Sequence, residues 1–314
     1  MTERHPSIEL IRGLHNVPPQ DAGCALTMGK FDGVHLGHQA LLAKTRAAAD
    51  ALGLPATVLS FDPSPREFFK PDAPVRRIST LRDKLGALES FGVDRLVLAR
   101  FSHALADTSP EDFVEQILVA RLGVKAIIVG DDLRFGRNRA GDYNYLQQCG
   151  QRMGFDVYSV GTVDVGGERC SSSAVRDSLA DCDFDRAQKL LGRPYAVSGR
   201  IRKGLQLGRK LGMPTANIAI AKRLAIPLGV YAVTARLGEK TWQGVASLGI
   251  RPTLGLTQCL LETYLFDVNI DLYGQLLEVE FHHFLRGEIR FDDMDALREQ
   301  MHRDAADARQ LLNS

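Results

Sequence analysis

The sequence predicts two folds in succession: an α/β domain on a doubly wound parallel sheet, then a small antiparallel Greek-key β-barrel with a closing C-terminal helix. Two observations predict this order. From Cys24 to about Asp185, short apolar runs alternate with longer amphipathic stretches. From about Gln188 onward, the chain changes to short β-rich runs punctuated by glycine, until a helical pattern ends it.

The short apolar runs of the first part are predicted to be buried strands. They are Cys24–Met28, Ala56–Phe61, Arg95–Ala99 and Ala126–Val129. The amphipathic stretches between them are predicted to be helices. These are His38–Leu52, Thr80–Phe91 and Ser109–Leu122. Because strand and helix alternate along the chain, the strands are expected to run parallel in one sheet.

The β-rich runs of the second part fit a small closed or Greek-key barrel better than another strand–helix–strand layer. They are Tyr195–Ile201, Gly229–Arg236, Thr241–Leu248, Leu260–Phe266 and Leu276–Leu285. In the last stretch, from Met294 to Leu312, apolar residues recur on one face of a helix. We expect this helix to pack against the barrel.

The length of 314 residues is about twice the commonest domain size, so two domains are expected. The pattern of apolar residues changes from alternating strands and helices to short β-rich runs near residues 183 to 188. We therefore place an N-terminal domain at residues 1–185 and a C-terminal domain at residues 186–314.

The composition excludes several classes of protein. Lysine and arginine number 39 against 38 acidic residues, a net charge of +1, so no broad basic field favours nucleic acid as a partner. The five cysteines are odd in number and never spaced Cys-x-x-Cys, which argues against a disulfide framework and a zinc site. Neither a secretory signal nor a membrane-spanning run is present. We expect a cytoplasmic protein without a membrane partner, and the sequence leaves homo-oligomerisation open.

The segment between the first strand and the first helix has the composition of an anion-binding turn. It reads Gly29-Lys30-Phe31-Asp32-Gly33-Val34-His35-Leu36-Gly37-His38. Free N–H groups at a helix start favour a phosphate, and glycines let the backbone approach it. His35 and His38 share one helix face, where two imidazoles can stabilise charge on a reacting phosphate. An isolated His-x-Gly-His is also explained by a helix cap and one exposed histidine.

Two further segments place polar groups where a ligand can bind. The first, Val129–Gly141, follows another apolar strand, and its candidate contacts are Asp132, Phe135 and Arg139. The second, Cys170–Arg176, begins a helix, where Ser172, Ser173 and Arg176 can hold a triphosphate. The structural alternatives are a solvated loop for the first segment and ordinary helix capping for the second.

In their order and separation, these three segments resemble the FAD synthetase half of the bacterial bifunctional riboflavin kinase/FMN adenylyltransferase family, over roughly residues 20 to 185. The Phe61-Asp62-Pro63 segment is similar to that family too, although Ser64 stands where a bulkier polar residue is common and Leu133 replaces a usual phenylalanine. The resemblance implies a Rossmann-like nucleotidyltransferase domain that transfers an adenylyl group from ATP to FMN, with FAD and pyrophosphate as products.

The same resemblance implies roles for individual residues. Catalysis is expected from His35, His38 and Arg176. ATP binding is expected from Gly29, Phe31, Asp32, Gly33, Ser172 and Ser173. Flavin contacts are expected from Asp62, Asp132, Phe135 and Arg139. Because the phosphate of FMN is already anionic near neutral pH, this reaction requires no protein base.

The most distinctive stretch of the chain is residues 199–217. Its basic loop contains Gly199, Gly204, Gly208 and Arg209, and Pro214-Thr215-Ala216-Asn217 ends it. No Gly-Lys-Ser/Thr closes the loop, so it is not a Walker A motif. Its glycines can cradle phosphates, and the hydroxyl of Thr215 and the amide oxygen of Asn217 suit a hard cation. A charged surface hairpin is the structural alternative.

Pro-Thr-Ala-Asn with its upstream glycines resembles riboflavin kinase, and the resemblance covers nearly all of residues 187 to 314. It continues in Leu191–Tyr195, Gly229–Tyr231, Gly249–Thr253 and Leu261–Tyr264. It implies a riboflavin kinase-like barrel that converts riboflavin and ATP into FMN and ADP. It also implies that ATP binds at the glycines and Arg209, and that Mg²⁺ or another divalent cation binds at Thr215 and Asn217.

Riboflavin presents a neutral hydroxyl that must lose its proton, so a carboxylate base is expected in the kinase half. Glu262 stands where the family has its catalytic glutamate. Arg286 and Phe291 lie in a segment that matches the family's flavin pocket, and they are the expected flavin contacts.

The leading hypothesis is a bifunctional enzyme with ATP, riboflavin and FMN as its small-molecule substrates. A kinase with an inactive N-terminal half is one alternative, against which the intact His35, His38, Ser172 and Arg176 argue. A non-catalytic sensor of flavin or nucleotide is another. Glu262 argues against it, because binding alone requires no base.

Overall fold

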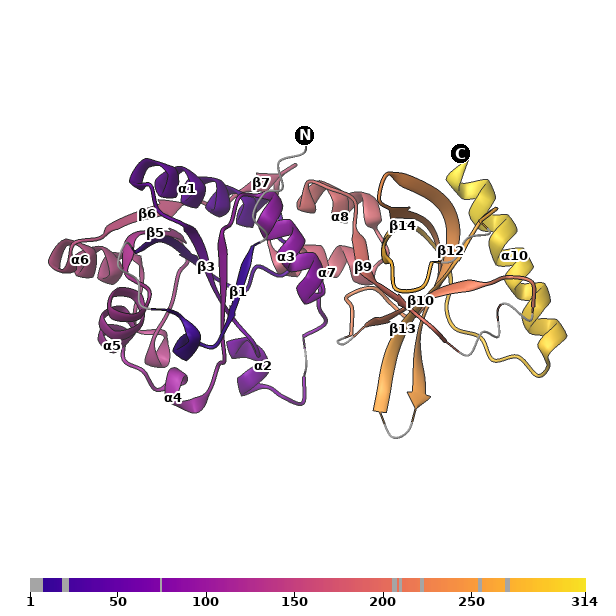
Figure 1. Ribbon diagram of the computed structural model, residues 1–314, viewed down its shortest axis with the longest axis horizontal. Helices are drawn as coiled ribbons and strands as arrows, with labels where there is room; N and C mark the ends of the chain where they lie inside the picture. Colours follow the sequence, from indigo (N-terminus) through magenta and orange to yellow (C-terminus); the bar gives the residue numbers. More distant parts are fainter. Residues whose placement is uncertain are drawn as a thin grey trace. The chain divides into compact units, whose positions relative to one another are not determined.

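The computed structural model describes residues 8–18, 23–73, 75–204, 208, 211–220, 223–253, 256–268 and 272–314. The chain forms two compact units (Figure 1). The first consists of Met1–Val75 and Lys84–Ser171, and the second of Arg76–Asp83 and Ser172–Ser314. The boundary between residues 185 and 186 stays a prediction. Contacts group residues 172–185 with the second unit, together with a short segment from much earlier in the chain.

The first unit is built on a parallel sheet that, within the described residues, has six strands in the order β1-β4-β3-β2-β5-β6. The strands are β1 (Glu9–Arg12), β2 (Cys24–Met28), β3 (Ala56–Phe61), β4 (Arg95–Ala99), β5 (Val124–Gly130) and β6 (Asp156–Val160). The chain passes from β2 to β3 and β4 on one side, then crosses to β5 and β6 on the other. The strand order therefore reverses between β2 and β5, and doubly wound sheets bind ligands at the carboxyl ends of the strands there.

Helices cover both faces of this sheet, which confirms the predicted α/β architecture. The helical elements are η1 (Leu14–Asn16), α1 (Leu36–Leu52), α2 (Pro65–Phe69), α3 (Leu81–Ser90), α4 (His103–Ala106), α5 (Pro110–Asp112), η2 (Phe113–Arg121), η3 (Arg137–Arg139) and α6 (Tyr143–Met153). On one face, Ala49 of α1 packs in a core with Ala25 of β2. On the other, Leu118 of η2 packs with Leu26 of β2. Successive residues of β2 thus serve opposite layers.

The region predicted as one helix over Ser109–Leu122 differs in detail. The short α5 is followed by η2, which is wound as a π-helix. A small antiparallel hairpin of β7 (Asp164–Val165) and β8 (Glu168–Arg169) precedes the end of the unit.

The second unit opens with α7 (Ser172–Ala180) and α8 (Phe184–Leu191), and then forms a closed antiparallel barrel. Its strands are β9 (Ala196–Arg202), β10 (Thr215–Ile220), β11 (Gly229–Leu237), β12 (Lys240–Thr253), β13 (Leu256–Leu265) and β14 (Leu276–Arg286). Within the closed order β10-β13-β12-β11-β14-β9, the run β14-β11-β12-β13 has the spatial order 4-1-2-3 of a Greek key. The predicted barrel is confirmed.

The closing helix α10 (Met294–Leu312) has the predicted bounds. Its N-cap is Asp293, whose carboxylate accepts a hydrogen bond from the backbone N–H of Ala296 at 2.7 Å. Its buried face presents Ala305 and Ala308, which pack in one core with Val230 and Ala232 of β11. The small alanine side chains let the helix lie close to the barrel wall.

The segment 76–83 belongs to the second unit although it lies within the N-terminal half of the sequence. The N–H of Arg77 donates to the carbonyl of Arg223 at 2.9 Å, and the N–H of Ala225 donates to the carbonyl of Arg77 at 2.8 Å. Asp83 Oδ1 accepts from the N–H of Ser198 in β9 at 2.9 Å and from its hydroxyl at 2.5 Å. This segment is called the strap below.

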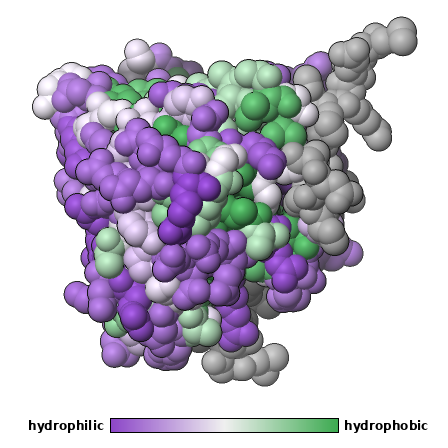
Figure 2. All heavy atoms as spheres, turned by 90° about the vertical axis from the view of Figure 1, so that its left-hand side faces the viewer, coloured by the Kyte–Doolittle hydropathy of each residue, from purple (hydrophilic) through white to green (hydrophobic). Residues whose placement is uncertain are grey.

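On the face shown in Figure 2, most exposed residues are hydrophilic, and hydrophobic residues gather in one part of it. Across the described residues, every helix is too short or too polar to span a bilayer.

Candidate active sites

The turn after β2 lies at the switch point of the first sheet, where the sequence predicted an anion site. Its backbone is left-handed at Phe31 (φ 48°), Gly33 (φ 84°) and Val34 (φ 45°), and Phe31 and Val34 are fully buried. Two non-glycine residues in this conformation cost free energy, which the surrounding packing must offset. The turn is therefore held in one shape, as a preorganised binding loop requires.

The two predicted catalytic histidines meet at the start of α1. His35 is the residue before the helix, and its ring stacks on that of His38 with centroids 3.7 Å apart. The ring of Phe31 lies 4.7 Å from that of His38. Gly37 leaves room for this arrangement, because a Cβ there would lie 3.2 Å from the ring of His35. Both imidazoles therefore stand at the positive end of the α1 dipole.

The backbone carbonyl of Lys30, within the turn, accepts hydrogen bonds from two side chains of other elements. Lys84 Nζ of α3 donates to it at 2.7 Å, and Ser60 Oγ of β3 donates to it at 3.2 Å. Lys84 is 6% exposed, a rare degree of burial for a lysine. The ammonium of Lys30 lies 3.8 Å from the carboxylate of Asp32, which is 1% exposed. No local pattern in the sequence marks Lys84, since only the packing of α3 brings it to the turn.

Cys170 lies beside the histidine pair, with its Sγ 3.5 Å from His35 Nδ1. Burial raises the pKa of this thiol. It is therefore protonated near neutral pH and serves as a packing group next to the imidazole. Ser172, Ser173 and Arg176 follow two to six residues later in the chain, at the start of α7 in the second unit.

Within the second unit, Arg176 is held by backbone carbonyls. Its Nη1 donates to the carbonyl of Ser172 at 3.1 Å, and its Nε donates to the carbonyl of Arg76 at 3.0 Å. Ser172 is half-buried and Ser173 is exposed. The shared site of these residues with the two histidines stays a prediction.

The expected flavin contacts of the first unit follow neighbouring strands. Asp62 comes directly after β3 and is half-buried, whereas Asp132 follows β5, is exposed, and pairs with Arg169 at 2.5 Å. Phe135 is 8% exposed and packs against Phe113, with ring centroids 5.5 Å apart.

The ring of Phe135 thus has a structural role in the core of the sheet. Arg139 is exposed and left-handed, with φ 58°. The flavin contacts of these four residues stay predictions.

An aromatic cluster at the carboxyl ends of β3 and β4 was not singled out from the sequence. Its members are Phe61, Phe68, Phe69, Phe101 and His103. The ring of Phe101 lies 5.3 Å from that of Phe68 and 5.9 Å from that of Phe69. Phe69 is 62% exposed and His103 is exposed too, whereas Phe61, Phe68 and Phe101 are half-buried. The Phe-Phe pair after Pro65 was the available signal, but Phe101 lies in a different segment, just after β4.

In the second unit, the strand register brings the predicted kinase residues together. Asn217 of β10 lies directly opposite Glu262 of β13, and Thr215 lies opposite Tyr264. Directly paired residues share one face of a sheet, with Cβ atoms about 5 Å apart. The same row continues to Arg202 of β9 and to Ser247 of β12. Sequence reasoning missed Arg202 and Ser247, because register between distant strands is invisible to it.

Asn217 has the features of a cation ligand. Its side chain is 5% exposed, and its Nδ2 donates to the carbonyl of Thr215 at 3.1 Å. Its Oδ1 is buried and accepts no hydrogen bond from any described residue. A buried amide oxygen left in this way is costly unless a ligand satisfies it. Oxygen donors from Asn217 and Thr215 fit Mg²⁺, which takes few protein ligands and completes its shell with phosphates and water.

The predicted glycines of the kinase half have distinct surroundings. A Cβ at Gly199 would lie 2.2 Å from Ile218 Cγ2, and one at Gly204 would lie 3.0 Å from the amide of Asn217. The carbonyl of Gly208 accepts from the N–H groups of Leu211 at 3.1 Å and Met213 at 2.8 Å. Gly199 is therefore required by packing, and Gly204 leaves the space beside Asn217 clear. Arg209 lies outside the described residues.

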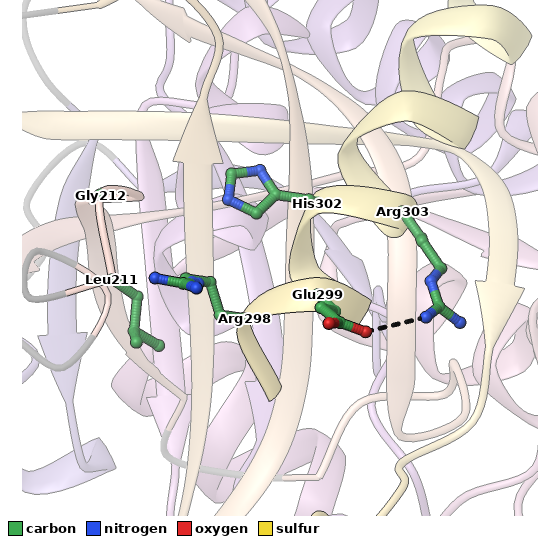
Figure 3. Close-up of a pocket in the computed structure, with 6 residues that line it drawn as sticks. All are labelled: Leu211, Gly212, Arg298, Glu299, His302 and Arg303. Carbon is green, nitrogen blue, oxygen red and sulfur yellow. Dashed lines mark hydrogen bonds and ion pairs between the residues drawn. The ribbon is translucent and has the colours of Figure 1, made fainter. Parts of the chain in front are cut away.

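A pocket of about 710 Å³ lies between the end of this loop and α10 (Figure 3). It is lined by Leu211, Gly212, Arg298, Glu299, His302 and Arg303. Arg303 pairs with Glu299 at 3.2 Å, whereas Arg298 and His302 extend toward the loop in the close-up. Basic side chains of α10 therefore line the pocket opposite the end of the loop.

Arg286 occupies a structural position at the end of β14. Its guanidinium makes a bidentate ion pair with Asp304 of α10, at 2.9 Å from Nε and 2.6 Å from Nη2. Its charged group also lies 5.9 Å from the ring of Phe291, which is half-buried. The ion pair joins α10 to the barrel, and flavin contacts from Arg286 and Phe291 stay predictions.

Comparisons with known proteins match both units. A family model described as FAD synthetase matches residues 17–174, and one described as riboflavin kinase matches residues 191–312. A bifunctional riboflavin kinase/FMN adenylyltransferase of Pseudomonas fluorescens is 45% identical, with 97% of this chain and 98% of that protein covered. The protein of that name from Haemophilus influenzae is 44% identical, with 98% and 100% covered.

Among solved structures, one titled as a macrolide-efflux protein from Streptococcus pneumoniae is similar over 95% of this chain and 97% of its own, with a TM-score of 0.75 and 27% identity. The shared fold therefore extends over both units.

Proposed function

The chain belongs to the bifunctional riboflavin kinase/FMN adenylyltransferase family, and from this membership we propose how its residues carry out the two reactions. The C-terminal half converts riboflavin and ATP into FMN and ADP. The N-terminal half converts FMN and ATP into FAD and pyrophosphate. We assign these halves to residues 186–314 and 1–185.

For the kinase reaction, the pairing of Asn217 with Glu262 is the observation that carries the proposal. The ribityl hydroxyl of riboflavin is neutral and must lose a proton as it attacks the γ-phosphate of ATP. The carboxylate of Glu262 accepts that proton. The half-buried position of Glu262 keeps the carboxylate close to the substrate and partly shielded from water.

Mg²⁺ would be held by Thr215 and Asn217, and when bound it neutralises charge on the phosphates of ATP. The loop with Gly204 and Gly208 binds the phosphates beside this pair, and Arg209 supplies positive charge. Arg202, in the same row as Asn217 and Glu262, is a further candidate contact to a phosphate.

For the adenylyl transfer, the turn at Gly29–Gly33 and the stacked His35–His38 pair bind the phosphates of ATP. An oxygen of the FMN phosphate attacks the α-phosphorus, and the bond to the β-phosphate oxygen breaks, so that pyrophosphate leaves. The histidines and the α1 N-terminus stabilise the charge that develops on the transferring group. Ser172, Ser173 and Arg176 contribute hydroxyls and a guanidinium.

The flavin of FMN is proposed to lie on the aromatic cluster around Phe69, next to Asp62. An isoalloxazine ring stacks well on an exposed phenyl ring, and Phe69 offers the exposed surface. Asp132, Phe135 and Arg139 remain candidate contacts, as do Arg286 and Phe291 for riboflavin in the kinase half. We propose that the protein works in the cytoplasm, without nucleic acid or membrane as a partner.

The overall assignment is tested by incubating the full chain with riboflavin, ATP and Mg²⁺ and following both flavins over time by chromatography. FMN that appears first and is then converted to FAD supports both halves. FMN that accumulates unchanged contradicts the adenylyl assignment, and unchanged riboflavin contradicts the kinase assignment.

A further inference from the structure

A buried lysine below the anion-binding turn has no part in the mechanism described so far. Lys84 comes from the first turn of α3, far from the turn in sequence, and its ammonium lies 2.7 Å from the carbonyl oxygen of Lys30. Burial of an ammonium costs several kcal/mol unless polar groups compensate for it. Because an apolar side chain would fill the same space without this cost, the burial of a lysine here points to a role for its ammonium group.

The contact fixes the direction of a peptide group. The carbonyl of Lys30 and the N–H of Phe31 belong to one planar trans peptide, so they point in opposite directions. Lys84 and Ser60 both donate to this carbonyl, from α3 and from β3. Together they prevent the peptide from rotating, although the left-handed Phe31 at φ 48° favours such a rotation.

The held peptide lies near the start of the turn that ends at the histidine pair. Phe31 contacts the ring of His38, with centroids 4.7 Å apart, and His38 stacks on His35 at 3.7 Å. A rotated peptide at residues 30–31 would therefore displace the ring of Phe31 and, through it, both imidazoles. Lys84 also brings a positive charge beneath a loop that receives an anion.

We propose that Lys84 is a positioning residue for adenylyl transfer. It holds the Lys30–Phe31 peptide, and thereby the backbone N–H groups and the two histidines, in the arrangement that binds the phosphates of ATP. This inference rests on the proposed function of the first unit. Ser60 is its partner, because both side chains hold the same oxygen atom.

Substitution of Lys84 separates the hydrogen bond from the charge. Lys84→Met removes both, whereas Lys84→Gln keeps a donor without the charge. We expect Lys84→Met to lower kcat for FAD formation from FMN about 100-fold and Lys84→Gln about tenfold. Riboflavin phosphorylation by the same preparations should stay within about twofold, because the kinase residues lie in the other unit. Equal losses in both variants would contradict the positioning role.

Two further measurements distinguish positioning from general support of the fold. Arg82→Met is the control, because it removes an exposed positive charge two residues before Lys84 in α3. It should leave FAD formation within about twofold. Ser60→Ala should lower kcat about threefold. In a double-mutant cycle with Lys84→Met, the two effects on kcat should be non-additive, since both side chains hold one carbonyl. Additive effects, or losses that follow the melting temperature, would overturn the proposal.

Binding of inorganic pyrophosphate with Mg²⁺, measured by calorimetry, gives a readout without catalysis. We expect Lys84→Met to weaken it about tenfold relative to the unsubstituted chain, and unchanged binding contradicts the role of Lys84 in holding an anion. If the unsubstituted chain forms no FAD from FMN, the proposed function of the first unit fails, and this binding difference still decides the role of Lys84.

Discussion

At the scale of single residues, each proposed reaction depends on its own set of side chains, and one set can be changed without altering the other. Glu262→Gln keeps the shape and polarity of the side chain but removes the base. We expect it to lower FMN formation by about 10² to 10⁴, while FMN supplied from outside is still converted to FAD. Initial rates of both reactions, measured separately, check this. Glu280→Gln, at another half-buried glutamate of the barrel, is the matched control.

His38→Ala tests the first unit in the opposite sense. Loss of the stacked imidazole should stop FAD formation while FMN still accumulates from riboflavin. His283→Ala, at an exposed histidine of β14, should alter neither reaction. Loss of both reactions in a folded His38→Ala protein would contradict the assignment of separate sites.

The aromatic cluster makes a residue-scale prediction about substrate binding. Phe69→Ala removes exposed ring surface without opening a cavity in the core, since the ring is 62% exposed. We expect KM for FMN in FAD formation to rise about tenfold with little change in KM for ATP. Steady-state kinetics with each substrate varied in turn separates the two. An equal rise in both constants would place the flavin elsewhere.

How far the sequence predicts the structure depends on the range of the interactions concerned. The strands Cys24–Met28, Ala56–Phe61 and Arg95–Ala99 and the helix Met294–Leu312 were predicted with their observed bounds, since burial and period mark them locally. Strand β10 was not predicted as a strand, because a glycine-rich basic loop and Pro214 lead into it. The row that joins Arg202 to Ser247 and the contact of Lys84 with Lys30 arise from packing between distant segments, which local patterns do not encode.

At the scale of elements, the ion pair between Arg286 and Asp304 joins α10 to the barrel. Asp304 is 4% exposed, so its removal leaves a poorly solvated guanidinium. We expect Asp304→Ala to lower the free energy of unfolding of the second unit by about 3 kcal/mol. Arg286→Ala should have a similar effect, and the double variant should lose clearly less than the sum. Chemical denaturation of the variants checks this, and additive losses would contradict a shared interaction.

A half-buried histidine in the wall of the barrel leads us to expect that the stability of the second unit depends on pH. Burial, and next the charge of His283, lowers the pKa of His282 on β14. The unfolded chain therefore takes up the proton first as the pH falls below about 7.5, and stability decreases from there until the pH passes below the lowered pKa of the folded state. His282→Gln should flatten this part of the profile for the second unit. Burial raises the pKa of Glu280 and acts in the opposite sense, so the difference between parent and variant is the quantity to measure.

At the scale of the whole molecule, the strap makes the second unit discontinuous in sequence. A fragment of residues 172–314 lacks Arg77 and Asp83, and so leaves the N–H of Ser198 and the carbonyl of Arg223 without these partners. We expect the fragment to unfold several degrees below the second unit in the intact chain. Calorimetry of both proteins checks this. Equal melting temperatures would show that the strap adds no stability.

The discontinuity has a consequence for the order in which a newly made chain folds. Asp83 and its partner Ser198 are 115 residues apart in sequence. At ordinary rates of translation, the strap leaves the ribosome on the order of ten seconds before β9 follows it. During that interval the first unit can complete its sheet, while the hydrogen-bond partners of the strap in the second unit have not yet been made. A nascent chain of this protein therefore carries, between two parts of a finished unit in the sequence, a segment whose hydrogen-bond partners are synthesised only with the next unit.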